Sequence, residues 1–442
     1  MSNNIRLTEK LYTIISSFVL RECCTRIIEL AAIFLLFLLI INSGCKEHKP
    51  ASPTPDIQVD EQFWIRILLL DNIRQCSIVI DSNFSIEEEN ADSKKKVKTA
   101  FKPLDKPINV QIYNSQINIS DQNYVSSRIV FSPENPHIFN LNNKPYRGKV
   151  KIISNPDGTS FDVINLVPLE SYIAGVAGAE MPDYWEPEAL KCQVIASRTY
   201  CLFIKKRFGS NRTWDLNKTA ANQVYLGIEA ESPAVWKAVN ETSGMILTCR
   251  QADGTESIFP SYYCSTCGGH TENSENVFGD SYEPLKGVPC TYCKNVAKPE
   301  IFFWPDVKFE IGDVNDRLMN KYPAFSRLGK IVEISTDRQS DYEEFSRLTR
   351  IKISGSNGNS EFLRAEDFRL TLDPTGRKFM SAACKFTKSD NNLIFSNGRG
   401  WGHSVGMCQC GAQGMAREGK KAKEILNYYY PDSKILKIEY NK

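Results

Sequence analysis

The chain has 442 residues, of which 42% are hydrophobic, 11% aromatic and 24% charged. That composition is typical of a protein that folds in water, and the length favours more than one domain, so neither wholesale disorder nor a multispanning membrane protein is expected. Lysine and arginine number 54 against 52 for aspartate and glutamate, a net charge of +2, which excludes nucleic acid as the expected general partner.

Residues 1–45 are predicted to be an export segment. Basic residues precede an apolar run from Ala31 to Ile41, which is shorter than the roughly 20 residues of a comfortable membrane span. Cys45 follows Ser-Gly and resembles the lipid-attachment cysteine of bacterial lipoproteins, although Asn42 stands where that motif prefers leucine. We therefore expect a lipoprotein tethered in the cell envelope, in the periplasm or at the cell surface. An uncleaved membrane anchor and a buried core helix are the alternatives.

The next residues are predicted to form a tether and then β structure. Residues 46–61 are rich in proline, which favours an extended spacer. Residues 63–80 are rich in bulky apolar residues and break at Asp71-Asn72, which indicates two strands joined by a turn. The charged stretch 81–106 is interpreted as a solvated loop. Strand signals continue to residue 166, so residues 62–166 are expected to be a strand-rich N-terminal part.

Helices are predicted from Val167 onward. Pro168–Met181 has the apolar content of a buried helix that Pro182 ends. A second helix should begin at Pro187 and end at Gly209, with acidic residues at its start and basic residues at its end. A last helix is expected over residues 411–430. The whole pattern predicts an α+β protein, a strand-rich mixed fold with a few helices.

Glu180 lies within the apolar sequence GVAGAEMP, near the end of the first predicted helix. Apolar neighbours remove water from a carboxylate, which raises its pKa and allows it to stay protonated near neutral pH. Such a group can serve as a general acid. The structural alternatives are a carboxylate that caps a neighbouring helix or that pairs with Arg198.

Two cysteine pairs, Cys264-x-x-Cys267 and Cys290-x-x-Cys293, indicate a metal site. Each pair has the spacing that a tetrahedral metal ion requires, although the segment between them is slightly longer than the common 15–20 residues or so. Structural zinc is the favoured interpretation for this loop, residues 264–293. Disulfides are the main alternative in an exported protein, and a redox-active pair is a third.

Four long motifs resemble, in the same order and with similar spacing, the SpoIID family of bacterial cell-wall proteins, which includes amidase enhancers. They are VPLESYIAGVAGAEMPDYWEPEALKCQVIASRTY, NQVYLGI, SYYCSTCGGHTENSENVFG and GRGWGHSVGMCQCGAQGMAREGKKAKEILNYYYP. The likeness also takes in IRILLLDN and LRAEDFRLTL. It therefore spans roughly residues 62–432, with residues 167–432 as a catalytic core around a cleft and residues 433–442 as a tail.

The resemblance implies a lytic transglycosylase that acts on peptidoglycan glycan strands, with Glu180 as the catalytic residue. It also implies a set of substrate-binding candidates: Arg198, Gln223, His270, His403 and Gln409. His270 is alternatively a zinc ligand, and His403 a buried core histidine. In family relatives the position of Cys264 is commonly histidine, which supports metal ligation there. Cys408 and Cys410 depart from the family pattern, and their role is left open.

The chemistry implied by the resemblance needs one carboxyl group. Protonated Glu180 would donate to the oxygen between N-acetylmuramic acid and N-acetylglucosamine. The resulting carboxylate would then take the proton of the muramic acid 6-hydroxyl, giving a 1,6-anhydro end without water. Hydrolysis would need a second carboxylate about 5–9.5 Å away. Candidates for it are Glu170, Asp183, Glu186 and Glu188. The alternatives of other classes are a non-catalytic peptidoglycan-binding activator of a cell-wall amidase and a zinc-dependent scaffold.

Overall fold

A computed structural model describes residues 63–89, 96–113, 115–120, 122–124, 126–251 and 254–438, all of which belong to one compact unit. The predicted export segment with Cys45, the tether 46–61 and the last four residues of the tail lie outside the described residues. None of the helices that the structure describes is both long and apolar enough to cross a membrane.

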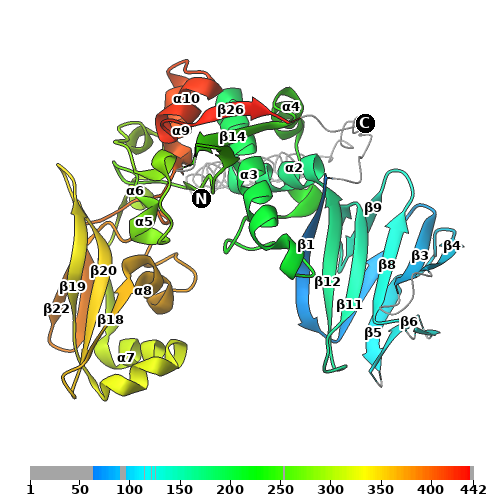
Figure 1. The fold of residues 1–442 in the computed structure, drawn as a ribbon, viewed down its shortest axis with the longest axis horizontal. Coiled ribbons are helices and arrows are strands. Elements are labelled where there is room, and N and C mark those ends of the chain that lie inside the picture. The colour runs from blue at the N-terminus through cyan, green and yellow to red at the C-terminus, as the bar shows by residue number, and fades with distance from the viewer. Residues whose placement is uncertain are drawn as a thin grey trace, which may run out of the picture. The chain divides into compact units, whose positions relative to one another are not determined.

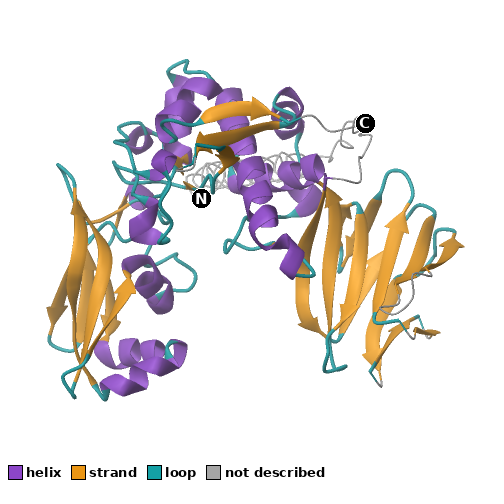
Figure 2. Cartoon of the chain, in the orientation of Figure 1, coloured by secondary structure: helices purple, strands orange, loops and turns teal. Residues whose placement is uncertain are grey.

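The N-terminal part is built from two sheets (Figures 1 and 2). Its strands are β1 (Trp64–Ile73), β2 (Gln75–Val79), β3 (Phe84–Glu89), β4 (Lys96–Phe101), β5 (Ile108–Tyr113), β6 (Gln116–Ile119), β7 (Gln122–Tyr124), β8 (Arg128–Pro133), β9 (Ile138–Leu141), β10 (Lys144–Arg147), β11 (Lys149–Ser154) and β12 (Phe161–Pro168). One sheet has the order β13-β1-β12-β11-β8-β3-β4, where β13 is Leu216–Asn217, and the other β10-β9-β2-β5-β6-β7. Alternate residues of β1, Ile65, Ile67 and Leu69, are buried, as expected for a strand with one face on a core.

Two predictions for this part need correction. The first strand does not end at Asp71-Asn72 but continues to Ile73, and β2 then joins the other sheet. The stretch 81–106 is not simply a solvated loop, because β3 and β4 pair within it as an antiparallel hairpin. Glu87 lies opposite Lys98 in this register, so opposite charges face one another across the strands and stabilise the pairing.

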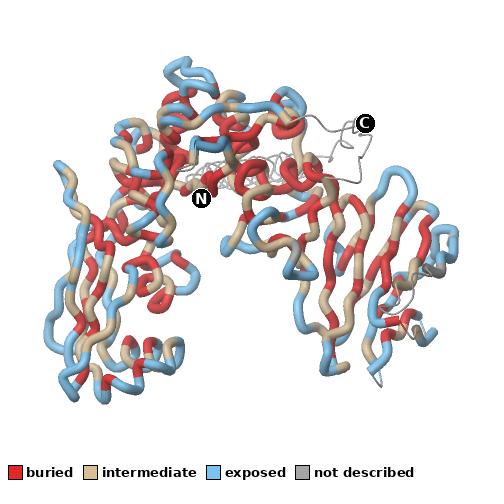
Figure 3. The backbone as a smooth tube through the Cα atoms, in the orientation of Figure 1, coloured by how far each residue is buried: buried red, intermediate tan, exposed pale blue. Residues whose placement is uncertain are grey.

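The two central helices agree with their prediction. They are α2 (Leu169–Glu180) and α3 (Pro187–Phe208). Most of α3 between residues 189 and 204 is buried (Figure 3), because it contacts α2, α4 (Pro233–Glu241), α9 (Gln409–Arg417) and α10 (Ala422–Tyr429). The predicted last helix is thus two helices, α9 and α10. The break follows from Gly419, whose φ of +87° ends a helix.

A second hydrophobic core is formed by residues between Trp304 and Phe395. Its elements are β17 (Phe303–Trp304), β18 (Val307–Glu310), α7 (Ile311–Lys321), β19 (Ile331–Asp341), β20 (Ser346–Gly355), β21 (Ser360–Arg364), α8 (Ala365–Leu372), β22 (Lys385–Ser389) and β23 (Asn392–Ser396). The remaining short elements are β14 (Met245–Arg250), β15 (Glu256–Ile258), β16 (Tyr263–Cys264), α5 (Ser274–Val277), α6 (Pro299–Phe302), β24 (Gly398–Arg399), β25 (Met407–Cys408) and β26 (Lys434–Lys437). The α+β prediction is confirmed.

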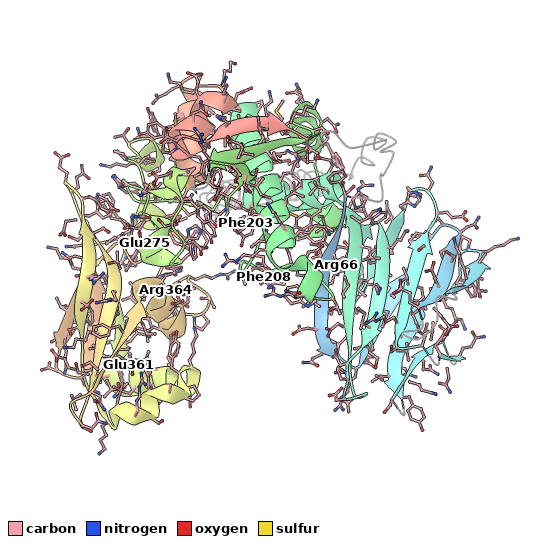
Figure 4. The ribbon with its side chains drawn as sticks, in the orientation of Figure 1. Arg66, Phe203, Phe208, Glu275, Glu361 and Arg364 are labelled. Carbon is pink, nitrogen blue, oxygen red and sulfur yellow. The ribbon has the colours of Figure 1, made fainter. Side chains whose placement is uncertain are left out.

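Two arginines join the second core to the cysteine-bearing segment. Arg347 is buried and donates to the carbonyl oxygens of Cys267 and His270 at 2.8 and 2.7 Å. Arg364, labelled in Figure 4, donates to the carbonyl oxygen of Phe278 at 2.5 Å. Two arginine side chains of the second core therefore hold this segment through hydrogen bonds to its backbone carbonyl oxygens.

Candidate functional site

Glu180 is the last residue of α2, and the chain leaves the helix at Met181 with extended backbone. The side chain is half-buried, and its Oε1 accepts the backbone N–H of Val224 at 2.8 Å. Burial raises the pKa of the carboxyl group, whereas the hydrogen bonds from Val224 and the Gln409 side chain oppose that rise. The environment therefore favours the neutral acid, as the sequence predicted from the apolar neighbours.

The close approach of Val224 depends on two glycines of α2. A methyl group added at Gly178 would overlap the carbonyl oxygen of Ala230, and one at Gly175 would lie 2.6 Å from the Tyr225 ring. The backbone N–H of Leu226 donates to the carbonyl oxygen of Gly175 at 3.4 Å. Because this face of α2 lacks side chains, the segment 218–230 can lie directly on the helix and bring Val224 to Glu180.

We expect Gly178→Ala to destabilise the protein by about 1–3 kcal/mol, because the added methyl group must displace backbone rather than a flexible side chain. Urea unfolding monitored by circular dichroism measures the change. Gly312→Ala in α7 is the matched control: nothing lies within 4 Å of its added methyl group, so it should leave stability unchanged or slightly higher. Equal effects of the two substitutions would contradict the role assigned to Gly178.

Gln223 is buried inside the protein and uses its whole amide there. Its Oε1 accepts the hydroxyl of Tyr172 at 3.1 Å, and its Nε2 donates to the Ser197 carbonyl at 3.2 Å and to the Tyr263 hydroxyl at 3.0 Å. The side chain is 1% exposed. The side chain of Gln223 therefore anchors the segment next to Val224 and does not present its amide to solvent.

Gln409, the first residue of α9 and one of the predicted substrate-binding residues, lies against Glu180. Its Nε2 donates to the backbone carbonyl of Glu180 at 3.1 Å and to the Oε1 of Gln193 at 3.2 Å. Gln193 in turn donates to the hydroxyl of Ser197 at 3.0 Å. A continuous buried polar network thus supports the carboxyl group from α3 and α9. No sequence pattern singled out Gln193 as a residue of this site.

Arg198 is not in position to bind a substrate. Its side chain has no exposed surface and forms a two-pronged ion pair with Glu170, with N···O distances of 3.0 and 2.7 Å. A third donor reaches the carbonyl oxygen of Met245 at 2.9 Å. The arginine therefore joins α2, α3 and β14 and does not pair with Glu180. Of the proposed second carboxylates, Glu170 is engaged in this ion pair, and Glu188 binds Lys191 and the backbone N–H of Ala422.

Four buried thiols converge in a group, here called the thiol cluster, in which all sulfur atoms lie within 4.8 Å of one another. Its members are Cys267, Cys290, Cys293 and Cys408. The predicted set contained Cys264 in place of Cys408. Thr266, between the first two cysteines, forms an antiparallel bridge with Trp401, so the segment does not fold back as a compact metal-binding turn. Cys264 instead lies beside Cys408 in the parallel pairing of β16 and β25.

The spacing of the thiol cluster suits a tetrahedral metal ion. The sulfur atoms of Cys267 and Cys293 are 3.8 Å apart. A zinc ion with bonds of about 2.3 Å to four sulfur atoms separates them by about 3.8 Å, whereas a disulfide requires about 2.05 Å. The backbone N–H groups of Cys267 and Gly411 donate to the sulfur of Cys408 at 3.3 and 3.4 Å and would stabilise this sulfur as a metal-bound thiolate, although burial alone raises the pKa of the thiol. The cluster could therefore hold one metal ion.

The two histidines lie outside the thiol cluster as defined by its four members. His270 stacks on Tyr342 with ring centres 4.2 Å apart, and its Nδ1 hydrogen bonds to the Thr271 carbonyl at 2.6 Å. His403 packs edge-on against Phe278, and its Nδ1 accepts the N–H of Val405 at 3.0 Å. Burial lowers the pKa of His403 to about 4, so it is neutral at physiological pH. These contacts favour the core interpretation of His403.

Replacement of Glu180 by glutamine should raise the stability of the folded protein at neutral pH. The raised pKa means that unfolding releases a proton at pH values between 4.5, the ordinary value, and the pKa in the folded state. Stability of the parent protein therefore falls as the pH rises through that window, while the glutamine variant does not titrate. Urea unfolding at pH 4 and pH 7 tests this. The difference in free energy of unfolding between Glu180→Gln and the parent protein should be larger at pH 7 than at pH 4. A difference that does not depend on pH would refute the prediction.

The α+β fold thus carries a carboxyl group with a raised pKa and, separately, a cluster of four thiols. A family model described as Stage II sporulation protein, SpoIID, matches residues 157–249. An uncharacterized protein of Brachyspira hyodysenteriae (strain ATCC 49526 / WA1) is 33% identical over 326 residues, which cover 74% of this chain and 80% of that protein. The chain belongs to the SpoIID family.

Two relatives with descriptive names are also similar. Stage II sporulation protein D of Bacillus subtilis (strain 168) is 29% identical over 298 residues, 64% of this chain and 78% of that protein. The amidase enhancer of the same organism is 26% identical over 358 residues, 74% of this chain but only 48% of that protein. The similarity thus spans most of the sporulation protein and about half of the enhancer.

Proposed function

We propose that this protein is a lytic transglycosylase that cleaves the bond between N-acetylmuramic acid and N-acetylglucosamine in peptidoglycan. The observation that carries the proposal is the Glu180 carboxyl group, whose pKa burial raises while Val224 holds one of its oxygens. A general acid requires a carboxyl group that is held in place and has a raised pKa. The family membership supports the choice of a cell-wall substrate.

In this mechanism Glu180 performs both proton transfers. The N–H of Val224 occupies one carboxyl oxygen, which leaves the other to carry the proton to the glycosidic oxygen. Departure of the leaving sugar produces an oxocarbenium-like centre at C1. The carboxylate then accepts the proton of the muramic acid 6-hydroxyl while that oxygen bonds to C1. Of the four candidates for a second carboxylate, Glu170 and Glu188 are held in ion pairs, so hydrolysis would have to use Asp183 or Glu186, which are both exposed.

The nature of the product tests the reaction class. Purified protein incubated with glycan strands in H₂¹⁸O should yield 1,6-anhydro ends without ¹⁸O, as measured by mass spectrometry. Reducing ends that carry ¹⁸O would indicate hydrolysis and a second carboxylate. Strands that stay intact would overturn the enzymatic proposal.

The second candidate function is a non-catalytic activator that binds peptidoglycan and stimulates a cell-wall amidase. It is favoured by the similarity to a protein named amidase enhancer. Stimulation of a purified amidase by wild-type protein and by Glu180→Gln alike, with no anhydro ends formed, would support this function in place of the first.

We further propose that the thiol cluster holds structural zinc. Four thiolates leave no open position, so the ion would stabilise the 267–293 loop rather than take part in the reaction. Hydrogen bonds from the neighbouring thiols lower the pKa of Cys290, whereas burial raises the pKa of Cys267 and of Cys408, so binding of an ion would release protons from the cluster. We also retain the proposals of export, lipid attachment at Cys45 and location in the cell envelope, which would place the enzyme next to its substrate.

A further inference from the structure

Tyr184 is the most exposed of the large hydrophobic side chains on the described residues, with 82% of its surface accessible. It lies four residues after Glu180, in the connection between α2 and α3. The next residue, Trp185, packs against the main core. The connection therefore anchors one aromatic ring in the protein and presents the preceding ring to solvent close to the carboxyl group in the chain.

The backbone that carries Tyr184 is held at both ends by α9. At the start of the connection, Gln409 donates to the carbonyl oxygen of Glu180 at 3.1 Å. At its end, the backbone N–H of Glu186 donates to the Oε1 of Gln413 at 2.9 Å. The two glutamines are four residues apart, so they lie on the same face of α9. Both are buried, with 5% and 2% of their surfaces exposed.

Tyr184 is therefore exposed without being part of a flexible loop, because its backbone is fixed. Pro182 and Pro187 restrict the backbone on either side of it, and the N–H of Trp185 closes a turn onto the Pro182 carbonyl at 3.1 Å. A tyrosine on a fixed backbone has two side-chain torsions to order on binding, so it can bind a ligand with a small loss of entropy.

A second exposed apolar side chain lies on the segment that carries Val224, whose N–H contacts the carboxyl group. Leu226, 40% exposed, follows two residues after Val224, and its backbone N–H donates to the carbonyl oxygen of Gly175 in α2. Both segments that meet at Glu180 therefore carry an exposed apolar side chain. Of the two, the aromatic ring of Tyr184 is suited to the apolar C–H face of a sugar ring, because that face loses water on contact and keeps its hydroxyl groups directed outward.

We propose that Tyr184 stacks on a sugar ring of the bound glycan strand beside Glu180 and sets the affinity for that strand. The inference rests on the proposed function for the identity of the ligand. It assigns Tyr184 to substrate binding and leaves the proton transfers to Glu180.

The test is a binding measurement in the Glu180→Gln background, so that the strand is not consumed. Purified peptidoglycan glycan strands are the probe, and isothermal titration calorimetry gives Kd. Tyr184→Ala should raise Kd about 3- to 10-fold, the range expected for loss of one stacked aromatic ring. Tyr184→Phe keeps the ring and should stay within about twofold of the parent. Tyr113→Ala, which removes a 64% exposed tyrosine on β5, is the matched control and should not change Kd.

The same variants in the Glu180-containing protein distinguish the two proposals. Tyr184→Ala should raise KM by the same factor with kcat retained, and its melting temperature should be unchanged because the ring is exposed. A Kd equal to that of the parent would overturn the role of Tyr184 even if Glu180 proves catalytic. If Tyr184→Ala weakens strand binding but the parent protein cleaves no strands, the stacking role of Tyr184 would stand and the proposed transglycosylase activity would be overturned. Absence of strand binding by the parent would overturn both.

Discussion

Glu180→Gln is expected to lower the rate of anhydro-end formation by about 10²- to 10⁴-fold, which is the contribution of a positioned general acid and base. The amide keeps the shape of the side chain and can still accept the N–H of Val224, but it has no proton to donate and cannot take one up. Mass spectrometry of digested glycan strands over time measures the loss. Circular dichroism and thermal melting should show an intact fold.

The matched control is Glu300→Gln, which removes an exposed carboxylate in α6 and should leave the rate within about twofold, as expected of surface substitutions. If Glu180→Gln retains more than a tenth of the parent rate, Glu180 is not the acid. The pH profile adds a second readout. Because the acid must be protonated for the first step, kcat/KM should fall as the pH rises through its raised pKa.

Cys408→Ser is expected to weaken metal binding and lower the metal content of the purified protein, whereas Cys264→Ser should leave both unchanged. Zinc contributes about 10–16 kcal/mol to small structural sites, so loss of one of four thiolates should weaken binding roughly 100-fold or more. Plasma mass spectrometry of the purified variants measures metal per chain and identifies the ion. The melting temperature of Cys408→Ser should fall, because the cluster joins segments far apart in the sequence and would be left without its central ion.

Cys264→Ser is a well-matched control, since its thiol is buried, lies on the neighbouring strand and is outside the thiol cluster. A chelator should lower the melting temperature of the parent protein and of Cys264→Ser but not that of Cys408→Ser. If metal is retained in Cys408→Ser and lost in Cys264→Ser, the ligands are instead the four cysteines predicted from the sequence spacing, with Cys264 in place of Cys408. Equal metal contents in all proteins, including none, would contradict a metal site built on Cys408.

Local patterns predicted the helices well where the signals were strong. Proline at the start of α3 and basic residues at its end bound the helix within one residue of the expectation. The same reasoning missed the break between α9 and α10, because a single glycine within a helical pattern is compatible with both outcomes until its backbone conformation is known. It also treated the charged stretch 81–106 as solvated, because the opposite charges neutralise one another only after β3 and β4 pair.

In the candidate site, too, the sequence predicted some features and only the structure revealed the others. The sequence alone singled out Glu180 and predicted the direction of its pKa shift, because the apolar neighbours that cause it are adjacent in the chain. It could not show that Arg198 is committed to Glu170 or that Gln413 holds the backbone after Glu180. Those contacts join residues whose numbers differ by 28 and 227, respectively, so no local spacing encodes them.

The thiol cluster shows most clearly what local sequence spacing identifies and what only the tertiary structure decides. Three of its four thiols lie in the two Cys-x-x-Cys pairs, which short-range spacing identifies by itself. The fourth, Cys408, reaches Cys267 across 141 positions through the parallel pairing of β16 and β25, while nearby Cys264 is kept out of the cluster. A metal ion requires sulfur atoms that converge in space. Within a tight turn, the spacing of cysteines along the chain determines whether their sulfur atoms converge. For cysteines on strands far apart in the sequence, only the tertiary structure determines it.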